Sequence, residues 1–262
     1  MVMDKVTIKN SILRLLPERM LFLLKKIHYI RSLKSFSEND VKVIEMLVKP
    51  GDYVIDIGAN VGWYTKVLSE LVGNDGCVYS IEPIPTTFKL LSHCIKKFGL
   101  NNVTLFNYAM SERNGYVFME VPKYESGGEN FYQAKIVENK KTENSLKTFK
   151  VESKSIDSLF SELPNNITFI KCDVEGHEFT VIKGAERVIK KSKPAWLIEI
   201  SGDPDDQSSD SYMLFKYLDK QEYTAYFFDG QKLNKHFQGD KSINYFFLTS
   251  QHLALLNECM KK

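Results

Sequence analysis

Cysteine is scarce in this sequence and follows no pattern that would bind a metal or specify a disulfide framework. The four cysteines are spread over the chain without a Cys-x-x-Cys pair and without a histidine at zinc spacing; they are Cys77, Cys94, Cys172 and Cys259. Free thiols are typical of a reducing compartment, so we predict a cytoplasmic protein with no structural zinc.

Long apolar runs are also missing. A bilayer-spanning helix needs roughly 20 consecutive apolar residues, and Lys25 and Lys26 interrupt the best candidate segment. Early charges such as Asp4 and Lys5 are not followed by the apolar core of a signal peptide. With 43% hydrophobic and 26% charged residues, the composition is that of a folded globular chain without a transmembrane segment.

The chain has little net charge, +2, but that charge is unevenly distributed. Residues 1–35 hold eight Lys or Arg and two acidic residues, within a segment that is apolar at roughly helical spacing. One interpretation is a helix that contacts an anionic membrane surface or lies over an anionic ligand, and the other is a helix that packs on the domain with its lysines in water. Nucleic acid is not an expected partner, because no basic stripe is interleaved with aromatics.

Strand-like and helix-like segments alternate from residue 53 to residue 200. This alternation predicts an α/β fold with a mostly parallel, Rossmann-like sheet and helices on both faces. Two aromatic segments, 223–229 and 244–250, follow without a helix between them and predict an antiparallel C-terminal hairpin at the sheet edge. We expect an N-terminal helical extension over 1–40 and one domain over 41–262.

One insertion, at about residues 115–151, interrupts the alternation. Strand-like segments flank a long polar loop that contains the Gly127-Gly128 pair and the aromatics Tyr124, Phe131 and Tyr132. A loop of that length is functional or partly disordered, so it is interpreted either as a flap over a substrate or as a surface loop.

The segment VIDIGANVGWYT places Asp56, Gly58, Asn60 and Gly62 where the first predicted strand of the sheet meets the next helix. Ligands of open α/β sheets bind at this edge, and Gly58 allows the backbone a sharp turn close to a ligand. Asn60 replaces the second glycine of a dinucleotide motif, and an acidic residue would repel a pyrophosphate. Asp56 suits a cationic ligand such as S-adenosylmethionine better, although Asp-x-Gly alone would also fit an ordinary turn.

Glu82 ends the second strand of this sheet, 26 positions after Asp56. A carboxylate there can accept hydrogen bonds from both hydroxyls of an unphosphorylated ribose.

A third polar cluster, in IKCDVEGHE, brings Asp173, Glu175, His177 and Glu178 to a strand-to-helix turn on the same sheet edge. Crowded titratable groups are a mark of functional sites. Alternatively, Glu175 and Glu178 simply favour the positive end of the next helix.

At this point the sequence resembles the FkbM family of methyltransferases, which share the class I S-adenosylmethionine-binding fold. The resemblance extends from about Val54 to Ile200 and rests on four motifs in the expected order: VIDIGANVGWYT, YSIEP, NYAMSERNG and FIKCDVEGHEFTVIKGAERVI. The DVEGxE and KGA elements are its most specific parts.

The resemblance implies a role for each matched residue. The glycine-loop residues Asp56, Gly58, Asn60 and Gly62 would line the methionine end of the donor, and Glu82 would hold the ribose. Residues 107–111 would border the adenine, with Asn107 or the backbone of Ala109 in contact, and Asp173 would face the transferable methyl group.

The predicted reaction is O-methylation of a sugar, a nucleotide-activated sugar or a glycosylated natural product. His177, Asp173 and Glu175 are the candidate catalytic residues, because a hydroxyl acceptor must lose its proton to a base. A divalent cation held by Asp173 with Glu175 or Glu178 is a second route, which we do not favour because these residues supply few ligands. An NAD-binding oxidoreductase and a non-catalytic interaction module are the alternative functions, and homo-oligomers are compatible with the sequence.

Overall fold

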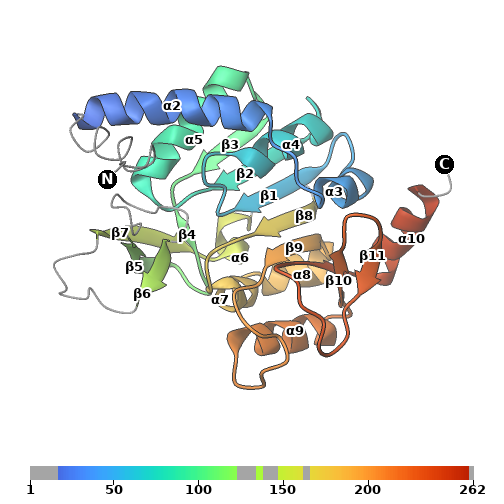
Figure 1. The fold of residues 1–262 in the computed structure, drawn as a ribbon. Helices are drawn as coiled ribbons and strands as arrows, with labels where there is room; N and C mark the ends of the chain where they lie inside the picture. The colour runs from blue at the N-terminus through green and yellow to red at the C-terminus, as the bar shows by residue number, and fades with distance from the viewer. Residues whose placement is uncertain (1–16, 123–133, 138–146, 162–165, 260–262) are drawn as a thin grey trace, which may run out of the picture.

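The computed structural model describes residues 17–122, 134–137, 147–161 and 166–259. A twisted central sheet runs through this part of the chain, with helices on both of its faces (Figure 1). Tyr124, Phe131, Tyr132 and the Gly127-Gly128 pair of the predicted flap lie outside the described residues.

The central sheet has eight strands in the order β11-β10-β12-β9-β8-β1-β2-β3. Five of them are parallel neighbours: β3 (Val103–Phe106), β2 (Cys77–Ile81), β1 (Tyr53–Ile57), β8 (Ile167–Cys172) and β9 (Ala195–Glu199). The predicted α/β architecture, mostly parallel with antiparallel pairing at the C-terminal end, is confirmed.

The arrangement of the last strands differs from the prediction in one respect. β10 (Thr224–Phe228) and β12 (Asn244–Leu248) pair antiparallel as expected, but β12 lies between β9 and β10. A short strand that was not predicted, β11 (Leu233–Lys235), forms the edge instead. β12 is therefore an inner strand, which explains why Tyr245, Phe246, Phe247 and Leu248 are all buried.

Alternate residues of the strands face two separate cores. Ile55, Ile170 and Trp196 pack against α7 (Glu178–Lys183), α8 (Glu186–Ser192) and α9 (Asp210–Lys220). Val54, Phe169 and Leu197 pack against α3 (Val41–Leu47), α4 (Trp63–Val72) and α10 (Ser250–Cys259). Both faces are covered, as a sheet of near-continuous apolar strands requires.

Two predicted helices are shorter than expected, and one was missed. The segment 178–191 forms two helices instead of one, because Asp157 replaces the bond that would continue the first helix: the Gly184 carbonyl accepts the N–H of Asp157 at 2.9 Å, and the Val188 N–H donates to Asp157 Oδ1 at 3.0 Å. α6 comprises only Ile156–Leu159, and the C-terminal α10 was not predicted.

The insertion forms a second, four-stranded sheet in the order β4-β7-β5-β6. The two predicted flanking strands, β5 (Gly115–Val121) and β7 (Lys147–Lys154), pair antiparallel along their length. β4 (Ala109–Met110) and β6 (Lys135–Val137) complete it, and Figure 1 shows this sheet beside the carboxyl ends of the central strands.

The N-terminal helix α2 (Glu18–Lys34) packs along α5 (Pro85–Phe98) on the outside of the molecule (Figure 1). Leu33 is buried against Val61, Leu90 and Cys94. The indole Nε1 of Trp63 donates a hydrogen bond to Ser32 Oγ at 3.0 Å. Within the described part of the chain, no helix is both long and apolar enough to cross a membrane.

Candidate active site

A cavity opens at the carboxyl ends of β1, β2, β3 and β8, closed on one side by the second sheet. Its walls come from Ile57, Gly58 and Asn60 after β1; Ile81, Glu82, Pro83 and Ile84 after β2; Tyr108, Ala109 and Met110 after β3; Met119, Ala134 and Ile136 of the insertion; and Asp173, Val174 and Glu175 after β8. Six of the residues singled out in the sequence are among them: Gly58, Asn60, Glu82, Ala109, Asp173 and Glu175. The insertion thus contributes an apolar wall.

The turn after β1 forms the base of this cavity. Gly58 has φ +74°, and a Cβ on it would lie 1.8 Å from the backbone oxygen of Asp173, so glycine is required there. Asn60 also has a positive φ of 51°, and its backbone N–H donates to Glu82 Oε2 at 3.0 Å. The β1 turn is thereby tied to the ends of both neighbouring strands. Gly62, also predicted to contact the ligand, is instead the first residue before α4 and packs against Leu91.

Glu82 is buried, and both of its carboxylate oxygens hold the walls of the cavity together. Oε1 accepts the backbone N–H of Ile84 at 2.8 Å, while Oε2 accepts that of Asn60. Burial raises the pKa of Glu82 to about 8, although these two hydrogen bonds oppose the rise. Each oxygen can accept a second hydrogen bond, and because Glu82 lines the cavity, ribose hydroxyls could donate there.

Asn107 supports the cavity from behind. Its side-chain amide donates to the backbone oxygens of Glu82 at 2.7 Å and Pro83 at 3.0 Å, fixing the loop after β2. The next residues, Tyr108 and Ala109, line the cavity directly.

Asp56 lies beneath the cavity and does not line it. Thr65 Oγ1 donates to Asp56 Oδ2 at 2.6 Å, and Oδ1 is buried without accepting a hydrogen bond from any described residue. Burial is the largest effect on the carboxyl and raises its pKa, and nearby Lys171 opposes that rise. Of the three acidic side chains expected at one rim of the sheet, Glu82 and Asp173 line the same cavity and Asp56 does not.

Lys171 is a buried charged residue that the sequence analysis missed. It is the strand partner of Asp56 in the β1–β8 pairing, and its ammonium donates to Asp173 Oδ2 at 2.8 Å. It also lies 4.9 Å from the centre of the Tyr64 ring. This buried cation neutralises part of the negative charge of the two aspartates and fixes the Asp173 side chain at the cavity wall. A charged residue in the otherwise apolar strand ITFIKC was the available signal.

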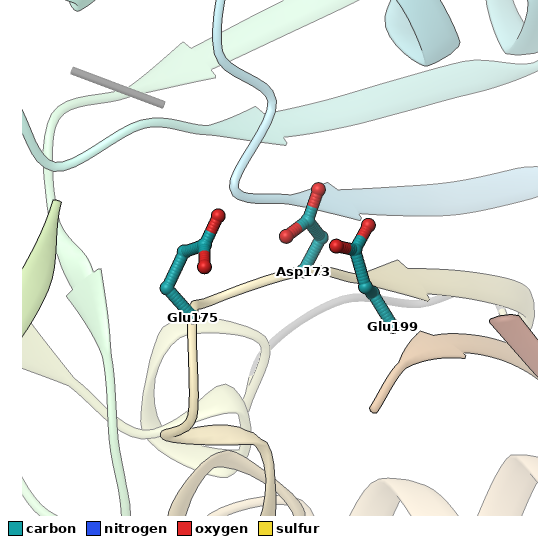
Figure 2. A group of neighbouring side chains, drawn as sticks. All are labelled: Asp173, Glu175 and Glu199. Atoms are coloured by element: carbon teal, nitrogen blue, oxygen red, sulfur yellow. The ribbon is translucent and has the colours of Figure 1, made fainter. Parts of the chain in front are cut away.

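Three carboxylates gather at the open side of the site. Asp173, Glu175 and Glu199 each offer an oxygen, and these atoms lie within 4.8 Å of one another. Figure 2 shows the three side chains around one shared space, from the end of β8, the loop after it and the end of β9. This spacing could hold a hard divalent cation. Glu199, which was not predicted, takes the place that the sequence analysis gave to Glu178.

Glu175 stands in an unusual backbone conformation. Its φ is 54°, and it precedes Gly176 with φ 95°, so the chain makes a tight left-handed turn that holds its carboxyl at the cavity wall. Burial and the charges of Asp173 and Glu199 raise its pKa to about 7. A carboxyl with that pKa is half ionised near neutral pH and can accept a proton there.

His177 and Glu178 lie on the other side of this turn. The Nε2 atom of His177 is 3.1 Å from Ser111 Oγ, and the residue does not line the cavity. Burial lowers its pKa, which leaves it neutral at pH 7. Glu178 Oε1 accepts the backbone N–H of Gly176 at 2.9 Å, which stabilises the turn, and Glu178 is also the first residue of α7, at the helix end that the sequence analysis considered for it.

These residues fit S-adenosylmethionine. Asp173 places a carboxylate in the cavity wall, which favours a positively charged ligand, and the Glu82 carboxyl in the same wall can accept hydrogen bonds from ribose hydroxyls. Tyr108, Met119 and Ile136 provide the apolar surface that an adenine requires.

Comparisons with known proteins agree with this interpretation. The sequence matches the methyltransferase FkbM domain over residues 56–225. Among curated proteins, a protein-L-isoaspartate O-methyltransferase of Ignicoccus hospitalis is 40% identical over 58 residues, 22% of this chain and 28% of that protein. A probable cobalt-precorrin-6B C(15)-methyltransferase (decarboxylating) of Saccharolobus solfataricus is 42% identical over 62 residues, 23% of this chain and 31% of that protein. The chain therefore spans less than a third of the length of these relatives.

Among solved structures, the methyltransferase FkbM of Methylobacillus flagellatus KT is similar, with a TM-score of 0.47 and 14% identity, over 86% of this chain and 60% of that one. The fibrillarin of Aeropyrum pernix with bound S-adenosyl-L-methionine has a TM-score of 0.45 and 12% identity, over 77% of this chain and 67% of that one. The domain match decides against the NAD-binding oxidoreductase. The chain belongs to the FkbM family of S-adenosylmethionine-dependent methyltransferases.

Proposed function

We propose that the protein transfers a methyl group from S-adenosylmethionine to a hydroxyl of a sugar, a nucleotide-activated sugar or a glycosylated natural product. The observation that carries this proposal is Glu175, a carboxyl with a pKa of about 7 in the wall of the same cavity that presents Glu82 and Asp173. A hydroxyl acceptor needs a base at this place, whereas a more acidic acceptor would not.

The three carboxylates of the rim also fit the chemistry of a sugar. Asp173, Glu175 and Glu199 can accept hydrogen bonds from neighbouring hydroxyls and so orient the one that reacts. They would repel a phosphate at the reacting end, which argues against nucleic acid and requires the diphosphate of a nucleotide-activated sugar to lie away from the rim. A small-molecule acceptor therefore suits the site best.

The proposed mechanism divides the work among few residues. The donor, when bound, would supply a methyl group on a positively charged sulfur. Asp173, held by Lys171, would bind and orient that sulfonium end; because the charge on sulfur disappears as the methyl group is transferred, this contact would act by positioning. Glu175 accepts the hydroxyl proton as the oxygen–carbon bond forms, and the electron pair of the breaking carbon–sulfur bond stays on sulfur.

We favour Glu175 over His177 as the base. His177 is bound to Ser111 outside the lining of the cavity, whereas Glu175 lies in its wall. A cytoplasmic location is proposed with this function, since all four cysteines are free thiols.

The test is an acceptor screen by mass spectrometry with methyl-labelled S-adenosylmethionine and a panel of neutral saccharides, nucleotide sugars and glycosylated natural products. We expect a methyl mass increment on at least one sugar hydroxyl. Glu175→Gln should reduce the turnover on that acceptor by about 100-fold or more, the usual contribution of a general base. His177→Gln is the matched control and should retain most of the rate.

Three results would contradict the proposal. Labelling of a nitrogen or carbon acceptor in place of any sugar would reject the substrate class. Full activity of Glu175→Gln together with loss of activity in His177→Gln would move the base to the histidine. Tight donor binding with no acceptor in any chemical class would favour the non-catalytic interaction module.

A further inference from the structure

Helix α2 is apolar on two opposite sides, and the described part of the protein covers only one of them. On the inner side, Phe22, Tyr29 and Ile30 pack around the buried Leu33. On the outer side lies a stripe of four exposed side chains, Met20, Leu23, Leu24 and Ile27, whose exposed fractions run from 44% to 56%. Their spacing of three and four residues places them in one row. An exposed row of this kind marks an interaction surface.

Exposed cations lie at both ends of this apolar stripe. There is no Asp or Glu between Glu18 and Glu38, while the segment holds five Lys or Arg. Arg19 lies beside the first residue of the stripe and is exposed. Arg31 and Lys34, four and seven positions after Ile27, continue its line toward the C-terminal end of α2 and are also exposed.

Helix α5 adds positive charge beside α2. His93 of α5 lies within electrostatic reach of Lys26, Lys96 and Lys97, and its pKa is lowered first by burial and then by these three cations. Figure 1 shows α2 along α5 as an outermost layer of the molecule. Positive charge therefore also lies on the side of α2 that faces α5, opposite the apolar stripe.

We propose that the outer face of α2 binds an anionic membrane surface. Met20, Leu23, Leu24 and Ile27 would enter the boundary between headgroups and acyl chains, while Arg19, Arg31 and Lys34 would pair with the lipid phosphates. A second copy of the chain is a poorer occupant, because a two-fold interface through α2 would bring together two faces that both carry exposed cations and no acidic residue between Glu18 and Glu38. The inference does not depend on which acceptor is methylated.

The proposal has a consequence for the active site. α2 packs on Val61 and Trp63, which directly follow the cavity residue Asn60 in the chain. A membrane on the outer face of α2 would be separated from these residues by the width of the helix, about 10 Å.

The experiment is co-sedimentation of the full chain with vesicles of phosphatidylcholine alone or mixed with phosphatidylglycerol. We expect binding only to the mixed vesicles, and weaker binding as salt is added. Arg31→Gln combined with Lys34→Gln should weaken it by about 25-fold, at roughly fivefold for each cation. Leu23→Ser combined with Leu24→Ser should weaken it by about tenfold or more.

Two matched controls test whether the effect belongs to α2. Lys191→Gln removes an exposed cation of α8. Ile243→Ser removes an apolar side chain that is 66% exposed and directly precedes β12. Both should bind vesicles as the unchanged protein does. Titration with S-adenosylmethionine checks that every variant is folded, because the substituted side chains lie outside the cavity.

Several outcomes would overturn the proposal. Equal binding to neutral and anionic vesicles would show that the cations do not contribute to binding. No binding to either kind of vesicle would show that α2 does not bind a membrane. Light scattering that finds a dimer, converted to a monomer by the Leu23→Ser and Leu24→Ser changes, would identify a second copy as the occupant instead.

Discussion

Replacement of Gly58 by alanine tests how the cavity is built. Gly58 has φ +74°, and its ideal Cβ would lie 1.8 Å from the backbone oxygen of Asp173 and 2.9 Å from that residue's carbonyl carbon. The obstacle is backbone, so no side-chain rotation can relieve it. An ordinary contact between these two atoms is longer by more than about 1 Å, so either the turn after β1 or the segment after β8 must move by at least that distance.

The cost can be estimated from the bonds that such a movement breaks. A left-handed conformation costs alanine about 1 kcal/mol or more relative to glycine. The Gly58 N–H donates to the backbone oxygen of Ile81 at 3.0 Å, and the Asp173 N–H donates to that of Ile57 at 3.1 Å. Weakening both adds about 2 kcal/mol, so we expect a loss of about 3 kcal/mol in the free energy of unfolding. A displacement of this size should also weaken donor binding by about 100-fold.

Gly99→Ala is the matched control for this change. Gly99 ends α5 with φ +66°, and a Cβ there would meet nothing within 4 Å. Its replacement carries the conformational cost alone, about 1 kcal/mol. Urea denaturation measures both stabilities and calorimetry measures the donor affinity. Equal losses for the two variants, or full donor affinity in Gly58→Ala, would refute the tight approach of the two turns.

Three further predictions concern the charges of the site. Activity of the unchanged protein should rise with pH through about 7, because Glu175 must be ionised to act as a base, and the pH-rate profile of Glu175→Gln should lack this step; an unchanged profile would contradict the assignment. Lys171→Met leaves Asp173 without its buried partner and should lower the free energy of unfolding, measured by urea denaturation, by about 3 kcal/mol. Lys66→Met, which breaks the surface pair with Glu70, should lower it by less than about 1 kcal/mol. Similar losses for the two variants would contradict the role of the buried ion pair. Glu82 has a pKa of about 8 in the free protein, so if ribose hydroxyls donate to its ionised form, donor binding below pH 8 must release a proton and the donor affinity should rise with pH. Calorimetry in buffers of different ionisation enthalpy measures the number of protons released. A value of zero would contradict this contact.

The sequence predicted the framework because the parallel strands carry near-continuous apolar runs and their ends meet at one edge. That rule placed Gly58, Glu82 and Asp173 at the cavity before the fold was known. It could not separate residues that line the cavity from those that support it. Asp56 and Asn107 point to backbone and side-chain partners below the surface, and such direction depends on contacts between elements.

Lys171 and Glu199 were missed for a related reason. Lys171 becomes meaningful only once the register pairs it with Asp56, and Glu199 only once β9 is known to lie beside β8. The break at Gly184 likewise comes from hydrogen bonds to Asp157, a residue that lies before β8 in the chain. Periodicity reports which face of an element is apolar, but it does not report which distant backbone lies against it.

The most direct test of the central claim is a crystal structure of the protein with S-adenosylhomocysteine. The account predicts the ribose hydroxyls within hydrogen-bonding distance of Glu82, the sulfur toward Asp173 and the adenine beside Tyr108. A ligand bound outside this cavity, or one whose ribose is held by residues other than Glu82, would contradict it.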